Sequence, residues 1–117
     1  MNLDKTLWGP DMWRTLHLLS FLYPVKPSAD DKKNMKNYIL ALRKVLPCEI
    51  CQLNFKRDLQ GRGVNSTTLE MALESRDSLS RFLVDIHNTI NNCNKKTVIP
   101  YDIVKQQYEK RIANSTK

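Results

Sequence analysis

The sequence predicts an all-α protein, most naturally a bundle of about five helices. Apolar residues recur at the three- and four-residue spacing of helices through most of the chain, whereas the alternation typical of strands is hard to find. Only three of the 117 residues are glycine. The length corresponds to one domain. We expect it to span residues 1–117, with a core over about 8–112 and a frayed polar tail over 113–117.

The first two helices are predicted from proline positions, a cap and an apolar stripe. Pro10 suits the first position of a helix, where its missing N–H costs nothing, and Trp13 and His17 then share one face. Two prolines in "YPVKPSADD" end this helix, and Ser28 with Asp31 forms a capping-box variant that starts the next. The second helix carries a predicted buried stripe of Met35, Tyr38, Ile39, Leu42, Val45 and Leu46.

A third helix is predicted directly after the second. Pro47 ends the second helix and can open the next one, because the residue before a proline disfavours the helical region. Gly61 is a plausible C-terminal cap, and "GRGVNS" is predicted to be a loop. One side of this third helix would carry Cys48, Cys51, Phe55 and Leu59.

The second half of the chain predicts a short helix, a long helix and a last helix. Thr67 and Glu70 form a capping box for the short helix, which breaks or bends near residues 75–78. The long amphipathic helix that follows has an apolar face of Leu79, Phe82, Leu83, Ile86, Ile90 and Cys93. Pro100 opens the last helix, with Tyr101, Val104, Tyr108 and Ile112 on one side.

The chain is basic, with a net charge of +7 and a pI near 9.5. This charge allows an anionic partner. However, the basic residues are spread along the chain in short pairs such as Lys32-Lys33, so we expect a solvated basic surface or a few contacts to a phosphorylated cofactor. No apolar run is long enough to cross a bilayer and the N-terminus does not resemble a secretory signal, which predicts a cytoplasmic protein.

The "LPCEIC" segment allows three kinds of site. A zinc site would need further ligands from Cys93, His17 and His87, whose spacing does not match a zinc finger. A structural disulfide across three residues closes a very small loop and removes little unfolded-state entropy. A redox dithiol fits the local physics better, because the N–H groups and dipole of a helix start lower the pKa of a thiol. All three interpretations remain open from the residues alone.

The long helix carries a polar cluster in "HNTINN". His87 and Asn91 are one helical turn apart, and Asn88 lies beside them although asparagine is a poor helix former. Together with the aromatic residues, the lysine pair and the CxxC, this cluster is what a bound aromatic cofactor with phosphates would need.

The ordered series "WGPDMWRTLH", "YP", "LPCEIC" and "HNTIN", followed by a lysine and an aromatic residue, resembles the Erv/ALR family of FAD-dependent sulfhydryl oxidases. The resemblance spans residues 8–108, and the short length resembles the members found in large DNA viruses. It implies a four-helix bundle plus a short fifth helix that holds FAD, usually as a homodimer. Electrons would pass from substrate thiols through the CxxC disulfide and the flavin to molecular oxygen, which forms hydrogen peroxide.

The resemblance also assigns residues. Cys48 would be the cysteine attacked by the substrate thiol, and Cys51 the cysteine next to the flavin. Tyr108 stands where many relatives have tryptophan. No metal is expected. The expected cofactor contacts are Gly9, Trp13, His17, Tyr23, Cys51, His87, Asn88, Asn91, Asn94, Lys96 and Tyr108.

Two departures from the family pattern concern cysteines. The N-terminal arm has none, so an intrachain shuttle pair is missing, and Cys93 has no obvious partner and is expected to be a buried, inert thiol. The substrate, such as a thioredoxin-like or CxxC-bearing protein, would therefore reach Cys48 directly. The alternative function is a zinc-stabilised or basic nucleic-acid-binding helical module, for which the second helix offers Lys32, Lys33, Lys36, Arg43 and Lys44.

Overall fold

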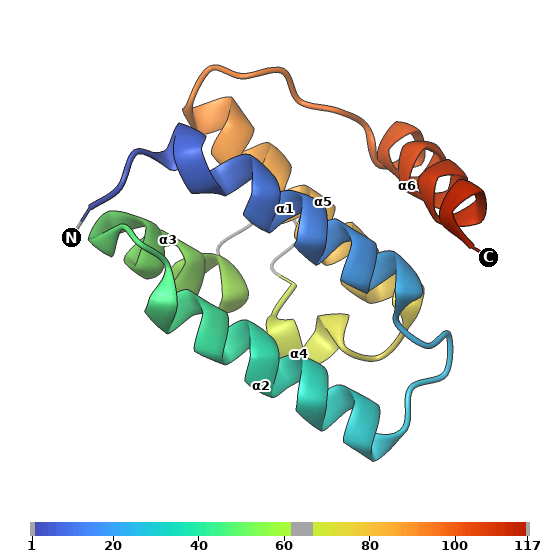
Figure 1. The fold of residues 1–117 in the computed structure, drawn as a ribbon. Coiled ribbons are helices and arrows are strands. Elements are labelled where there is room, and N and C mark those ends of the chain that lie inside the picture. The colour runs from blue at the N-terminus through green and yellow to red at the C-terminus, as the bar shows by residue number, and fades with distance from the viewer. Residues whose placement is uncertain (1, 62–66, 117) are drawn as a thin grey trace.

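The computed structural model describes residues 2–61 and 67–116, and this part of the chain is helical without strands. The all-α prediction is confirmed, with six helices where about five were expected (Figure 1). None of the described helices is long and apolar enough to span a membrane. The helices are α1 (Lys5–Leu22), α2 (Ala29–Val45), α3 (Glu49–Leu59), α4 (Leu69–Ala72), α5 (Arg76–Cys93) and α6 (Tyr101–Ser115).

One core joins the first five helices. α1 packs against α5, α2 packs against α3, and the four-residue α4 packs against α5 (Figure 1). Fully buried side chains from three helices meet in this core, namely Leu16, Ile39, Leu79 and Leu83. The last helix, α6, lies outside this bundle against α1 and α5, where Val104 packs with Phe21 and Val84 in a second, smaller cluster.

Local capping signals account for the starts of α2 and α5. Ser28 and Asp31 form the predicted capping box, with hydrogen bonds of 2.9 and 3.1 Å between each backbone N–H and the other residue's side chain. Ser75 and Ser78 form the same reciprocal pair at the start of α5. The predicted Ser28–Asp31 box is confirmed, whereas the Ser75–Ser78 box was not predicted, although both depend on residues only three apart.

The first helix begins earlier than predicted. Asp4 caps it by accepting a hydrogen bond of 2.9 Å from the backbone N–H of Thr6, so α1 starts at Lys5 and Pro10 lies inside it. The prediction that Pro10 opens the helix was therefore wrong. An interior proline removes one backbone hydrogen bond, and the cap together with the packing of Trp13 and Leu16 offsets that cost.

The start of α3 also differs from the prediction. Cys48, not Pro47, precedes the helix: it has an extended backbone and its Sγ accepts a hydrogen bond of 3.3 Å from the backbone N–H of Cys51. At the other end, Gly61 adopts the left-handed conformation predicted for a cap, with φ of 93°. Residues 62–66 of the predicted loop lie outside the described residues, and the cap of α4 is Thr68 rather than Thr67.

Three residues that were predicted to be buried are exposed. Val45 is 71% exposed because it is the last residue of α2, and Tyr38, in the middle of the same helix, is also exposed. Cys93 is an exposed free thiol, because it is the last residue of α5 and lies beyond the packed part of that helix.

α6 continues to Ser115, so residues 113–115 of the predicted polar tail belong to this helix.

Candidate functional site

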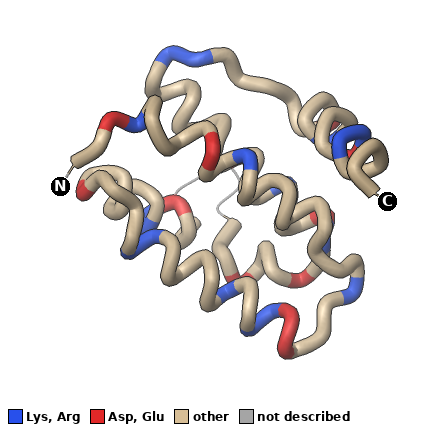
Figure 2. The backbone as a smooth tube through the Cα atoms, viewed as in Figure 1, with Lys and Arg blue, Asp and Glu red and all other residues tan. Residues whose placement is uncertain are grey.

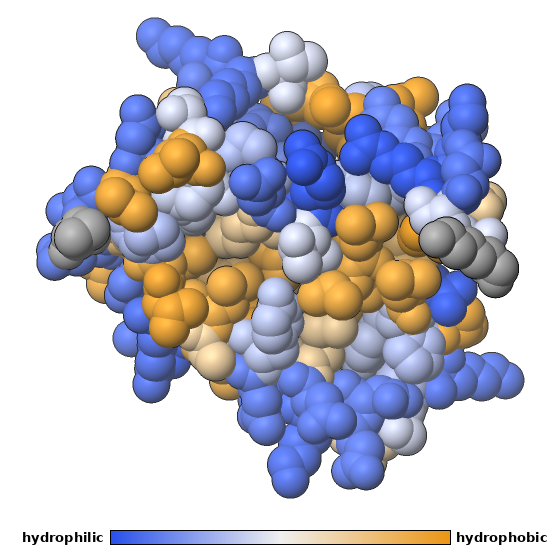
Figure 3. All heavy atoms as spheres, in the orientation of Figure 1, coloured by the Kyte–Doolittle hydropathy of each residue, from blue (hydrophilic) through white to orange (hydrophobic). Residues whose placement is uncertain are grey.

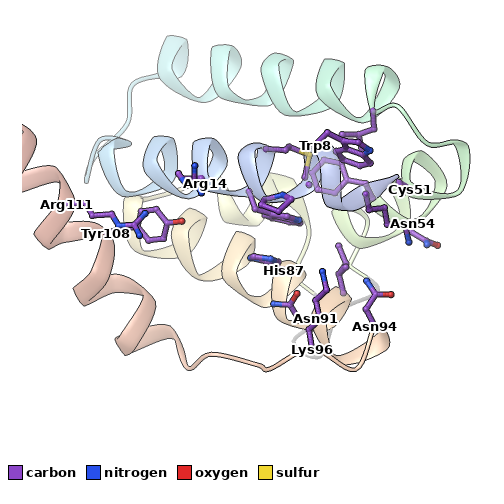
Figure 4. A pocket seen from close by; sticks show the side chains of 18 residues that line it. Trp8, Arg14, Cys51, Asn54, His87, Asn91, Asn94, Lys96, Tyr108 and Arg111 are labelled. Atoms are coloured by element: carbon purple, nitrogen blue, oxygen red, sulfur yellow. The ribbon is translucent and has the colours of Figure 1, made fainter. Parts of the chain in front are cut away.

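A cavity of about 410 Å³ lies where α1, α3, α5 and α6 face one another (Figure 4). This volume is in the range of small-molecule sites. The cavity brings together most of the predicted cofactor contacts, from all four helices and the turn after α5. Those that line it are Gly9, Trp13, Cys51, His87, Asn91, Asn94, Lys96 and Tyr108.

The two cysteines of the CxxC form a disulfide, with their Cα atoms 5.2 Å apart. Cys51 is half-buried and lines the cavity, whereas Cys48 is 6% exposed and does not. In the disulfide, neither sulfur is a free thiolate of the kind that zinc requires. Within residues 2–61 and 67–116, no group of three or more His, Cys, Asp or Glu side chains is placed to hold a metal ion.

Aromatic rings form one wall of the cavity. Trp13 and His87 stack with centroids 4.4 Å apart and an interplanar angle of 4°. Phe55 meets Trp13 edge-on at 6.3 Å. Trp13 is therefore held on two sides by other rings, and it presents a fixed apolar surface beside Cys51.

Two histidines support this wall. His17 Nε2 and His87 Nδ1 are 2.9 Å apart, so one ring donates a hydrogen bond to the other. His17 is buried behind the wall and does not line the cavity, and its Nδ1 has no hydrogen-bond partner. A buried N–H without a partner is rarer than a buried acceptor without one. We therefore place the His17 proton on Nε2, which leaves His87 protonated on Nε2.

Burial lowers the pKa of both imidazoles to about 4. The neighbouring His87 is the second cause for His17, and the Lys96 ammonium is the second cause for His87. Both rings are therefore neutral at pH 7, because a cation in this wall would lose its hydration without gaining an opposite charge.

This pair predicts an acid-sensitive fold. Between pH 6.5 and about 4 the unfolded chain binds protons that the folded protein does not. The contribution of this pair to the free energy of unfolding is therefore fully present above pH 6.5 and decreases as the pH drops to about 4. We expect a loss on the order of 2–4 kcal/mol across this window. Urea unfolding as a function of pH measures it, and His17→Gln should flatten the profile. An unchanged slope in that variant would contradict the assignment to this pair.

Cationic and amide side chains form another part of the lining. Lys96, Asn91 and Asn94 gather at one side, and Tyr108 and Arg111 reach in from α6 (Figure 4). The cavity is also lined by Lys5, Arg14 and Asn54, and none of its described lining residues is a carboxylate. An excess of cations over carboxylates among the lining residues favours an anionic ligand.

A strained turn places the Lys96 side of the cavity. After α5, Lys95 adopts the left-handed conformation with φ of 57°, which is unfavourable for a residue other than glycine. Its N–H bonds to Asn92 O at 3.1 Å, and the next N–H, of Lys96, bonds to Asn91 O at 2.7 Å. This pair of bonds is a Schellman motif. It reverses the chain, so that Asn94 and Lys96 both face the cavity.

Besides His17, two further predicted cofactor contacts, Tyr23 and Asn88, lie away from the cavity lining. The Tyr23 hydroxyl donates a hydrogen bond of 2.8 Å to Leu73 O and is buried in the core. The Asn88 amide makes two hydrogen bonds with the backbone of Ile99, at 2.7 and 3.1 Å, and so fastens the segment before α6 to α5. Both side chains have structural partners that are distant in sequence.

Sequence reasoning missed several lining residues. Trp8 and Met12 are one helical turn apart on α1, and Ile90 follows the apolar stripe of α5, so periodicity could have indicated them. Basic residues are too common on surfaces for Lys5, Arg14 and Arg111 to stand out. The lining residues that were not predicted are Lys5, Trp8, Pro10, Met12, Arg14, Leu46, Asn54, Phe55, Ile90 and Arg111.

The basic face of α2 does not form a continuous positive surface. Lys32 pairs with Glu74 at 3.0 Å and Lys36 pairs with Glu70. Acidic and basic residues are interleaved along the chain (Figure 2). These pairs therefore partly neutralise the face that the nucleic-acid alternative would use.

Comparisons with known proteins all indicate the same family. Residues 10–109 match the model of the Erv1/Alr family. The chain is 30% identical to the FAD-linked sulfhydryl oxidase ERV1 of Arabidopsis thaliana, over 87% of this chain and 50% of that protein. It is 28% identical to the FAD-linked sulfhydryl oxidase of African swine fever virus, over 92% of this chain and 85% of that protein.

The fold is also similar to a solved structure. The FAD-binding domain of Erv1 from Saccharomyces cerevisiae superposes with a TM-score of 0.79 at 22% sequence identity, covering 93% of this chain and 97% of that one. This similarity supports the helical fold independently of the sequence motifs.

Proposed function

Because this chain belongs to the Erv1/Alr family, we propose that it oxidises the thiols of protein substrates at the Cys48–Cys51 disulfide. The chain is an FAD-dependent thiol oxidase. The observation that carries the residue assignment is the position of Cys51, which belongs to the disulfide and also lines the cavity beside Trp13 and His87.

The cavity residues fit FAD. Trp13, His87 and Tyr108 offer ring faces for an aromatic ring system, and Lys96 and Arg111 offer cations for phosphates. Gly9 leaves open space, since a Cβ there would meet no atom within 4 Å. When bound, FAD supplies a two-electron acceptor that molecular oxygen can reoxidise.

The protein's own sulfurs perform thiol–disulfide exchange. A substrate thiolate attacks Cys48 Sγ, a bond forms between these sulfurs, the Cys48–Cys51 bond breaks, and Cys51 leaves as a thiolate. A second substrate thiolate then attacks the substrate sulfur of this mixed disulfide and releases Cys48 as a thiolate. The substrate gains a disulfide and loses two electrons, which the reduced cysteine pair now holds.

The start of α3 stabilises the leaving group of the second step. Cys48 occupies the cap position, where its sulfur accepts the Cys51 N–H at 3.3 Å. A helix N-terminus also favours negative charge. Both effects stabilise negative charge on the Cys48 sulfur and make its thiolate a better leaving group.

Thiol-bearing substrates and oxygen follow from the family, and we propose two finer features. The substrate is a protein with paired cysteines, such as a thioredoxin-like protein, because the departing Cys48 needs a second attacking thiol. The chain forms a homodimer, which is supported by the apolar side chains Leu22, Val25 and Tyr38 that are exposed on and beside α1 and α2.

The visible absorption spectrum tests the function directly. We expect the purified protein to show flavin bands that bleach when a dithiol is added and recover in air. If FAD is lost during purification, added FAD should restore the bands. A colourless protein that excess FAD cannot reconstitute would contradict the function.

A further inference from the structure

The N-terminal segment crosses the chain at Cys48. The Leu3 N–H donates a hydrogen bond of 2.8 Å to Pro47 O, and the Glu49 N–H donates one of 2.9 Å to Asn2 Oδ1. These two bonds fall on the residues immediately before and after Cys48. We call Asn2 and Leu3 the N-terminal strap.

A third bond fixes the strap from the other side. The Trp8 indole N–H lies 3.3 Å from Leu3 O and donates to it. The backbone of Leu3 therefore uses its donor and its acceptor, as a residue in the middle of a sheet does, although the partners here are a loop carbonyl and a side chain. The strap is therefore held in place through both the N–H and the C=O of Leu3.

The position of the strap conflicts with the chemistry at Cys48. A substrate thiolate must reach Cys48 Sγ, and the rate of exchange depends on that access. Cys48 is only 6% exposed, and the strap bonds to both of its neighbours. A protein substrate therefore cannot lie along residues 47–49 while the strap occupies them.

Exposed apolar side chains lie on the strap and on the helices that follow its two attachment points. Leu7 on α1 and Ile50 and Leu53 on α3 are each more than half exposed, and Leu3 is also exposed. Apolar surface gathers near the N-terminus, over the starts of α1 and α3 (Figure 3). Ile50 and Leu53 belong to the same helix as Cys51, so the patch lies on the element that carries the redox disulfide.

We propose that residues 47–49 and this apolar patch form the docking groove for an extended, cysteine-bearing segment of the protein substrate, and that the strap holds the groove closed until substrate displaces it. The substrate backbone takes over the hydrogen bond to Pro47 O, and an apolar residue next to its cysteine takes the place of Leu3. Main-chain pairing of this kind is a common mode of peptide recognition. The proposal rests on the proposed function, since it concerns access to the same disulfide.

The test measures the reaction rate of the Cys48 thiol in the full chain. It requires neither bound FAD nor oxidase turnover. In a Cys51→Ala/Cys93→Ser background, Cys48 is the sole thiol of the three cysteines. The probe is a short peptide with a leucine beside its cysteine, carried as a mixed disulfide with thionitrobenzoate. Attack by the Cys48 thiolate joins Cys48 to the peptide sulfur and releases the coloured thionitrobenzoate anion, whose absorbance gives the rate.

We expect Asn2→Ala to raise this rate about five-fold. The variant removes one hydrogen bond from the closed state, and one net hydrogen bond shifts an equilibrium by about this factor. Leu3→Pro, which removes the donor to Pro47 O, should raise it similarly. Asn37→Ala, an exposed asparagine on α2, is the matched control and should not change it. A peptide with N-methyl-leucine should react several-fold more slowly than the leucine peptide, because it cannot donate to Pro47 O.

Two results would overturn the proposal: parent-like rates in both strap variants, or equal rates for the two peptides. The pH dependence separates access from a change in thiol acidity. Opening the strap should raise the maximum rate reached at high pH and leave the midpoint of the pH profile unchanged. A shifted midpoint with an unchanged maximum rate would mean that Asn2 acts on the pKa of Cys48 instead. A negative result together with a normal flavin spectrum would leave the oxidase function intact.

Discussion

We expect Cys51→Ala to lower oxidase turnover by at least about a thousand-fold, because the reaction loses a nucleophile that it requires. The same variant should retain FAD, because Cys51 is one small member of a lining that otherwise remains in place. Cys48→Ala should lose turnover to a similar extent. It should disturb the flavin spectrum less, since Cys48 does not line the cavity.

Oxygen consumption with a protein dithiol measures turnover, and the visible spectrum measures bound flavin. Cys93→Ser is the matched control, because Cys93 is an exposed free thiol outside the cavity lining, and its turnover should equal that of the parent. Near-normal turnover in both CxxC variants would refute the assignment of the disulfide.

Trp13→Ala combines the largest expected loss of stability with loss of the cofactor. Trp13 is buried in the main core and contacts Phe55, His17 and His87 through its ring. Truncating a buried tryptophan costs about 3–5 kcal/mol. It also removes the aromatic wall beside Cys51, so we expect FAD binding to weaken beyond detection.

Urea unfolding of the flavin-free protein measures the change in the free energy of unfolding. Titration with FAD measures the change in cofactor affinity. Trp13→Phe, which keeps an aromatic ring in the core, should recover most of the stability and part of the affinity. If Trp13→Ala were within 1 kcal/mol of the parent in urea, the ring would not be the packed element that the structure indicates.

The predictable parts of this molecule depend on neighbours in sequence. The Ser28–Asp31 capping box and the shared face of Trp13 and His17 are set within one helical turn, and both are confirmed. The Cys48–Cys51 disulfide was expected from the family resemblance, since the spacing of the two cysteines alone left three kinds of site open. Capping pairs and side chains one turn apart have the same geometry in all helices, so residue spacing alone predicts these contacts.

The parts that could not be predicted depend on partners far along the chain. Tyr23 bonds to Leu73 and Asn88 bonds to Ile99, and neither sequence position indicates these partners. Both Asp4 and Pro10 could mark the start of the first helix. The helix begins after Asp4, so Pro10 does not have its expected place at the first position. In the same way, nothing local marks Asn2 as a partner of Glu49.

The position of α6 has a thermodynamic consequence. This helix contributes Tyr108 and Arg111 to the cavity, yet it lies outside the main core and packs through the small cluster around Val104. Any ligand that contacts Tyr108 or Arg111 binds the docked helix more tightly than the undocked one, and stabilises docking by mass action. Such coupling is reciprocal. A change at Val84 that weakens the packing of α6 should therefore lower cofactor affinity, by at most the factor by which the cofactor favours the docked helix, although Val84 does not line the cavity.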